Sequence, residues 1–327
     1  MLPAAASDHY SEQRRILAQV LSLARRVWGT RPPTDFDSWF DRNVELLVAA
    51  VASGQRQAVA GVDGYVADVL DELGTPVAAE VEPVTAGLVG VASDGRGLDS
   101  LMYGAVITSK RGIGQGLGLE DAWGLGMKAL LLRVQTQVAD AARVATGLSI
   151  TARPRVGYVR MLNPPSCRRC AVLAGRFYGH NRGFLRHPGC DCRHIPTRED
   201  RADDVTTDPK AYFDSLTAEQ QDTLFTRSGA QAIRDGADIN QVVNAERGMA
   251  TTQVYGRELA TTTEGVTRRG IAYDAMRRAG YAQRDTDVRS GRYFQARAPR
   301  LMPEAIYEIA EDRADALRLL RLYGYLA

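Results

Sequence analysis

A cluster of soft metal ligands near the middle of the chain is its most constraining feature. All four cysteines of the 327-residue chain, and three of its four histidines, lie within residues 163–197. The cysteines form two close pairs, Cys167-x2-Cys170 and Cys190-x-Cys192. A chain of this length can bury a full hydrophobic core and needs no disulfide framework to fold. Two such pairs, about twenty residues apart, instead predict one tetrahedral Zn²⁺ site.

The exact ligand set stays open at this level. The C-x-C spacing is the weaker half of the pattern, because zinc knuckles usually carry C-x2-C pairs. The second pair can therefore supply only one ligand, with His187 or His194 as the fourth. His187 lies just before Pro188 and close to Cys190, a position that suits ligation or support of a ligand.

We expect this zinc to be structural. Glycines and prolines frame the cysteines, which predicts a segment built of loops and ordered by the ion. In small peptides such an ion contributes of order 10 kcal/mol of apparent binding free energy. A catalytic zinc would need an open coordination position and a nearby general base, and the only close acids, Asp191 and Glu199, lie in no H-E-x-x-H or H-x-E arrangement. The remaining alternative is four buried thiols without a metal.

Hydrophobic periodicity predicts an α+β fold that is predominantly helical, with a small zinc-stabilised α/β unit in the middle. Short strands are expected within 148–162, immediately before the cysteines, and a threonine-rich linker at 251–263. A capping box is expected at Thr217 and Gln220. The predicted helices cover 7–29, which begins at Ser7 and stops at Gly29, then 35–52, 61–73, 120–147, which closes with Arg143 and Gly147, and 303–324, with shorter helical units over 203–225 and 226–248.

Four regions are predicted along the chain. Residues 1–110 form an N-terminal helical region, and 111–202 form a core that carries the Cys/His zinc motif. Residues 203–250 form a helical extension, and 251–327 form a region rich in arginine and tyrosine that ends in a helix. We expect no secretory signal and no membrane partner, because no apolar stretch approaches the ~20 residues that cross a bilayer. Folding in a reducing cytoplasm favours metal ligation over disulfides for the clustered cysteines.

Positive charge is concentrated in two arginine-rich windows, although the whole chain carries only +2. Between 153 and 201 there are eleven arginines and three acids, and between 268 and 300 there are nine arginines and three acids. Arginines interleaved with aromatic residues suit sequence-independent contact with nucleic acid. Solvated helix faces and internal salt bridges are the alternative interpretation. The candidates for contact with double-stranded DNA are Arg168, Arg169, Arg182, Arg186, Arg277, Arg278 and Arg292.

The order of residues around the cysteines resembles a known phage motif. The segment Asn163-Pro-Pro-Ser-Cys-Arg-Arg-Cys-Ala-Val-Leu-Ala-Gly175 is followed by His187-Pro-Gly-Cys-Asp-Cys192 and then Pro196. This order is similar to the C-terminal motif of phage Mu F-type (MuF-like) head morphogenesis proteins, with C-x2-C, L-x-G and a closing H-P-x-C-x-C. The resemblance is strongest over 120–200 and extends more loosely over 213–244, as in actinobacteriophage members.

The resemblance implies a minor capsid protein that is present in few copies. Such proteins join the procapsid during assembly in the host cytoplasm, associate with the portal protein, and lie inside the virion head near the portal. Major capsid or scaffold protein and packaged DNA are the further partners that it implies. It implies no catalytic residues, so we expect no enzyme activity.

Two other functions compete with this one. His180, in Gly-His-Asn-Arg, is similar to the histidine of an H-N-H nuclease, but the second histidine and the following helix of that motif are missing. A metal-dependent nuclease, or another enzyme acting on nucleic acid, is therefore the alternative. A DNA-binding regulator with a zinc knuckle would need a recognition helix, and the sequence contains no clear helix-turn-helix.

Overall fold

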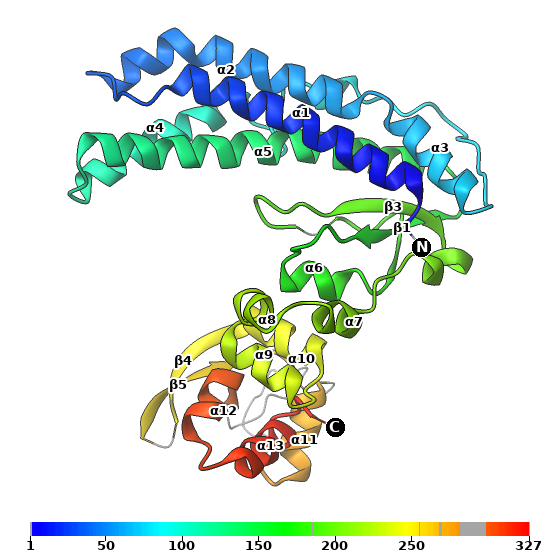
Figure 1. Ribbon diagram of the computed structural model, residues 1–327, viewed down its shortest axis with the longest axis vertical. Coiled ribbons are helices and arrows are strands. Elements are labelled where there is room, and N and C mark those ends of the chain that lie inside the picture. Colours follow the sequence, from blue (N-terminus) through cyan, green and yellow to red (C-terminus); the bar gives the residue numbers. More distant parts are fainter. Residues whose placement is uncertain (1, 185, 255, 268–269, 282–298, 327) are drawn as a thin grey trace, which may run out of the picture. The chain divides into compact units, whose positions relative to one another are not determined.

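The computed structural model describes residues 2–184, 186–254, 256–267, 270–281 and 299–326 (Figure 1). The chain divides into two compact units, and each contains two separate stretches of sequence. The first comprises Met1–Asn163 and Arg176–Thr206, and the second comprises Pro164–Gly175 and Thr207–Ala327. The described residues are mostly helical with small antiparallel sheets, which confirms the predicted α+β class. Within them, no helix is both long and apolar enough to cross a bilayer.

The first unit is built on helices that lie side by side and share one core (Figure 1). Three tryptophans form its centre. Trp28 stacks on Trp123 with ring centroids 4.0 Å apart, and the Trp39 ring meets both edge-on, with centroids 4.9 Å from each. The helices of this unit are α1 (Ala4–Trp28), α2 (Phe36–Val59), α3 (Val62–Glu72), α4 (Leu98–Gly114) and α5 (Leu119–Thr151), with a 3₁₀ turn at Ala86–Leu88.

Local signals explain most of these helix ends. Gly29 follows α1 with a φ of 72°, as the sequence predicts, and the Asp35 carboxylate caps α2 by accepting from two backbone amides. The predicted end of this helix at residue 52 is wrong, because α2 continues to Val59. The predicted cap at Ser7 is wrong, because α1 begins at Ala4. There the Glu72 carboxylate, 68 residues away in the sequence, accepts from the Ala4 amide at 2.6 Å. A cap supplied by a residue so distant in the sequence produces no recognisable pattern in the residues around the helix start.

Gly126 in α5 gives a test of the helix packing. A Cβ at this position would overlap Ser109 Oγ and lie 2.8 Å from the Trp28 ring. We expect Gly126→Ala to lower the free energy of unfolding by about 1–3 kcal/mol, because it overpacks the core. Gly124→Ala is the matched control: nothing lies within 4 Å of its Cβ, so better helix propensity should stabilise the fold. Urea titration measures the free energy of unfolding of both variants. Equal changes in the two would contradict the close packing of Gly126 against Ser109 and Trp28.

A three-stranded antiparallel sheet completes the first unit. Its strands are β1 (Val156–Met161), β2 (Phe177–Gly179) and β3 (Arg193–Arg198), in the order β2-β1-β3, followed by a 3₁₀ helix at Glu199–Asp204. β1 is buried along its whole length, and Val159 and Ile195 pack with Val66 and Leu70 of α3.

The predicted end of α5 is wrong, whereas β1 is one of the short strands expected within 148–162. α5 continues past Gly147 to Thr151, and the strand starts only at Val156. Ile150 packs into the core beneath the sheet, and the Ser149 hydroxyl donates to Asp63 at 2.6 Å. These tertiary contacts outweigh the helix-ending tendency of glycine.

The second unit is made of short helices and a small sheet. Thr217 and Gln220 form the predicted capping box. The strands β4 (Met249–Val254), β5 (Arg257–Thr262) and β6 (Arg300–Leu301) pair in that order. The helices are α6 (Arg168–Leu173), α7 (Pro209–Asp214), α8 (Ala218–Phe225), α9 (Arg227–Arg234), α10 (Ile239–Ala245), α11 (Ile271–Arg278), α12 (Pro303–Ile309) and α13 (Arg313–Leu322), with a 3₁₀ turn at Glu246–Gly248.

Two predictions for the second unit are wrong. The expected linker 251–263 forms most of the β4–β5 hairpin, because its threonines are β-branched and favour strands. The expected helix 303–324 is broken into α12 and α13, since the Asp312 side chain caps α13 by accepting from the Asp315 amide at 2.8 Å.

Candidate metal centre

The first cysteine pair lies at the start of α6. Cys167 is the residue before the helix, and Cys170 lies on its first turn. Because residues three apart in a helix share a face, the two side chains lie on the same side of α6. Tyr212 anchors the segment that precedes them. Its hydroxyl accepts from the Ser166 amide at 2.7 Å and donates to the Ser166 carbonyl at 3.0 Å. The C-x2-C spacing is thereby built into one turn of backbone.

The second pair lies on an irregular loop just before β3, and α5 holds this loop. Arg143 Nε donates to the Cys192 carbonyl at 3.0 Å, and Arg143 Nη2 donates to the Cys190 carbonyl. Asp140, one helical turn earlier, accepts from Arg143 Nη1 at 2.9 Å and also pairs with Arg186. The buried Asp140 carboxylate therefore holds one end of the loop 186–192 directly, through Arg186, and the other end through Arg143.

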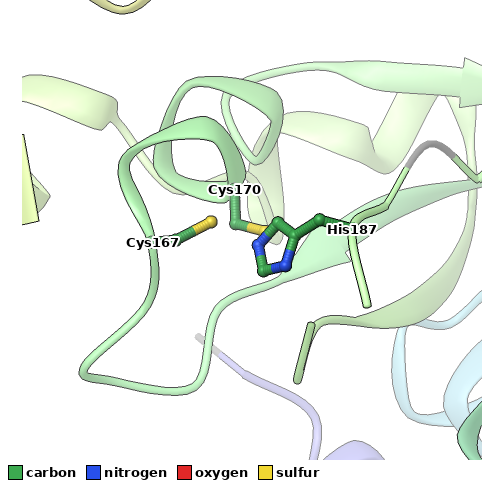
Figure 2. Close-up of side chains that lie close together, drawn as sticks. All are labelled: Cys167, Cys170 and His187. Atoms are coloured by element: carbon green, nitrogen blue, oxygen red, sulfur yellow. The ribbon is translucent and has the colours of Figure 1, made fainter. Parts of the chain in front are cut away.

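The side chains form two groups that share Cys170. The ligand atoms of Cys167, Cys170 and His187 lie within 4.8 Å of one another (Figure 2), and the same holds for Cys170, Cys190 and Cys192. All four cysteines are thiols, and only Cys167 is more than slightly exposed. The Nδ1 atom of His187 lies 2.9 Å from the Pro188 carbonyl oxygen, which leaves Nε2 as its ligand atom. This cluster can hold a metal ion.

His194, the other alternative ligand, belongs to neither group in the described chain. It lies on β3 with 4% of its surface exposed, and its ring packs 4.2 Å from Phe184 and 4.4 Å from Tyr158. Burial lowers the His194 pKa well below its ordinary value, and the charges of neighbouring arginines, Arg143 first, lower it further. In this structure it is a neutral packing residue beside the cluster.

Four of the arginines proposed to contact DNA make internal ion pairs. Arg168 binds Glu246 at 2.7 Å, and Arg186 pairs with the buried Asp140. The Asp274 carboxylate pairs with two others, Arg277 and Arg278. Two candidates, Arg169 and Arg182, are exposed, and Arg292 lies outside the described residues.

Asp140 and Arg143 are the functional residues that the sequence prediction missed. Arg143 was expected to close the helix over 120–147, yet the residue is 5% exposed and its guanidinium donates to the cysteine loop. One signal was present: Asp140 and Arg143 are spaced i, i+3 in an otherwise apolar part of 120–147. An opposite-charge pair on the buried face of a helix indicates a partner on another element.

Comparisons with models of protein families, with curated proteins and with solved structures find no match for this chain.

Proposed function

We propose that this chain is a minor head protein of a tailed phage, of the phage Mu F type, with a structural zinc centre. The observation that carries the proposal is the clustering of the motif cysteines. Cys167 and Cys170 come from one part of the resembling motif and Cys190 and Cys192 from its end, and Cys170 groups with the later pair. A motif in which distant cysteines meet serves to hold a loop-built segment in one conformation.

Zinc is the ion that these donors favour. Thiolates with an imidazole nearby select Zn²⁺ over Mg²⁺, Ca²⁺ or Mn²⁺, which prefer oxygen donors. The burial of Cys170, Cys190 and Cys192 suits a closed structural site better than a catalytic site with an open position. The rigid surface around the ion is then available for binding to the portal protein during procapsid assembly.

Reconstitution of procapsids tests the proposed role. The chain is co-expressed with the portal, scaffold and major capsid proteins of its own genome, and purified procapsids are analysed for its copy number. We expect a few copies per procapsid, and none when the portal protein is omitted. Procapsids that exclude the chain, or take it up equally well without portal, would overturn the proposal.

The exposed arginines give a prediction for DNA contact. We expect Arg169→Gln/Arg182→Gln to weaken binding to any duplex and to reduce the slope of log affinity against log salt by roughly 2, one phosphate contact for each. The control Arg15→Gln/Arg96→Gln removes the same charge from arginines paired with Glu12 and Asp94. Fluorescence anisotropy at several salt concentrations measures both. If the control changes the slope equally, the loss of affinity in Arg169→Gln/Arg182→Gln reflects net charge, and the predicted DNA contact of these two arginines is wrong.

A metal-dependent nuclease has one supporting observation. His180 lines a cavity of about 530 Å³ together with Glu199 and Asp200, where a histidine could act as a general base beside acidic groups. However, Arg198 already binds Asp200 at 3.1 Å. We expect purified protein to leave DNA intact with Mg²⁺ or Mn²⁺. Cleavage that His180→Ala abolishes would favour the enzyme instead.

A further inference from the structure

Two helices of the second unit border a cavity that lies outside the metal centre. α11 packs against α13 (Figure 1), and a cavity of about 620 Å³ lies where they meet. All of its lining residues lie within 271–281 and 318–326, which belong to the second unit. This volume is in the range of sites that bind small molecules or the side chains of a partner.

Close packing holds the walls of the cavity in place. Gly324, just after α13, has a φ of 67°, and a Cβ there would lie 2.7 Å from the Ala272 Cα. The buried Arg300 donates through Nε to the Tyr323 carbonyl at 2.8 Å and through Nη1 to the Glu264 carbonyl at 2.9 Å. These contacts tie the end of α13 to the segment before α11, so the cavity is formed without a ligand.

Apolar side chains line much of the cavity. Ile271 is 62% exposed and Tyr281 is 44% exposed, near the two ends of α11, whereas Leu322 on α13 is 8% exposed. Large apolar side chains that stay exposed among polar residues are typical of surfaces that bind another protein. The lining therefore offers contacts to the apolar side chains of a ligand.

Positive charge gathers at the same cavity. Four arginines and two carboxylates line it or pair with its lining: Arg277, Arg278, Arg318, Arg321, Asp274 and Asp315. Two positive charges are therefore left over. The Arg278 and Arg318 side chains are 75% and 61% exposed, and within the described part of the chain Arg321 has no carboxylate at ion-pair distance. The excess charge is accessible to an anionic partner.

These two properties together favour one class of ligand. A protein segment with acidic residues beside leucine-like side chains matches both, because its apolar face can enter the cavity while its carboxylates meet the guanidiniums. DNA phosphates would match the arginines but not the apolar lining.

We propose that the cavity between α11 and α13 binds an acidic amphipathic segment of a partner protein. Ile271, Tyr281 and Leu322 contact its apolar side chains, and Arg318 and Arg321 pair with its carboxylates. The site depends neither on the metal centre nor on the proposed assembly role.

Binding of synthetic peptides to the 327-residue chain tests the site. The probe is a fluorescein-labelled helical peptide with leucine along one face and glutamate along the other, and fluorescence anisotropy measures its affinity. One comparison peptide carries lysine in place of glutamate, and another carries serine in place of leucine. We expect the acidic amphipathic peptide to bind at least about tenfold more tightly than either, and to bind more weakly as salt concentration rises.

Variants of the lining locate the bound peptide on the chain. We expect Arg318→Gln/Arg321→Gln to weaken binding about 3–10-fold through the loss of two exposed ion pairs. Ile271→Ala should weaken it by about the same factor through the loss of buried apolar area. Because these side chains are exposed in the free protein, both variants should keep the Tm of the wild type.

Two matched controls lie elsewhere in the second unit. Arg247→Gln/Arg257→Gln removes the same charge from two exposed arginines, and Met249→Ala truncates a side chain that is 60% exposed on β4. Neither should change the affinity for the acidic peptide. Equal losses in controls and lining variants would show that net charge or general apolar contact, and not this cavity, binds the peptide.

Other outcomes would also overturn the site. These are no measurable binding of the acidic peptide, equal binding of the acidic and basic peptides, or an affinity that both lining variants leave unchanged. Duplex DNA that displaces the acidic peptide, and that binds more weakly to Arg318→Gln/Arg321→Gln but not to Ile271→Ala, would assign the cavity to nucleic acid instead. Failure of the chain to enter procapsids would end the proposed assembly role without affecting these measurements.

Discussion

Cys167→Ser/Cys170→Ser is expected to abolish metal binding and to unfold the segment between residues 163 and 197. Wild-type protein should carry about one zinc per chain and the variant almost none. Structural zinc contributes about 10–16 kcal/mol in small peptides, more than the short elements α6, β2 and β3 of this segment are expected to replace by packing. Elemental analysis measures the metal, and hydrogen exchange measures the order of the segment. The helices α1, α2, α4 and α5 should keep their protection, because their shared tryptophan core contains none of the cysteines.

Wild-type protein stripped by a chelator is the control for this experiment. Serine and cysteine are nearly the same size, so a packing defect cannot explain a large change in the variant. Stripped wild type should therefore show the same exchange pattern as the double variant. A zinc-free wild type with 163–197 fully protected would exclude a structural metal.

Asp140→Asn should be the most destabilising single substitution that leaves all candidate ligands in place. The Asp140 side chain is 1% exposed and is paired with Arg143 and Arg186. Removal of one partner of a buried ion pair usually costs about 3–5 kcal/mol, because a charge is left buried without compensation. For a unit of this size that corresponds to a fall in Tm of roughly 10 °C. Calorimetry of zinc-loaded protein measures it.

Asp37→Asn is the matched control, since Asp37 also pairs with a cation, Lys110, at 2.5 Å. That pair is on the surface: the Asp37 side chain is 52% exposed. Lys110 lowers the Asp37 pKa, but water and salt screen such pairs, so little change in Tm is expected. If the two variants behave alike, burial of the Asp140 pair does not contribute to stability.

Helix boundaries were predictable from the sequence wherever a short-range signal sets them. Gly29, Asp35 and the Thr217–Gln220 capping box act over four residues or fewer, and a sequence pattern of that length reveals them. The cysteines were predictable as candidate metal ligands for a similar reason, because metal ligation requires particular residue types at close spacing. In the structure Cys170 groups with Cys190 and Cys192.

The rest depends on contacts between residues far apart in the sequence. Glu72 caps α1 from 68 residues away, and the extension of α5 follows from packing of Ile150 into a sheet whose strands come later. Arg143 shows the same limit at the site. Its position near the end of an expected helix suited a dipole interaction, whereas its buried partners lie 47 and 49 residues further on. Local patterns contain no information about such partners.

The course of the backbone has a practical consequence for anyone who wishes to dissect this protein. The polypeptide changes unit after residues 163, 175 and 206, so each unit is discontinuous in sequence. A fragment that stops at 163 would keep β1 without its neighbours β2 and β3. No single truncation or protease cut can therefore release an intact unit. Isolation of either one requires excision of an internal segment and a short peptide to rejoin the ends.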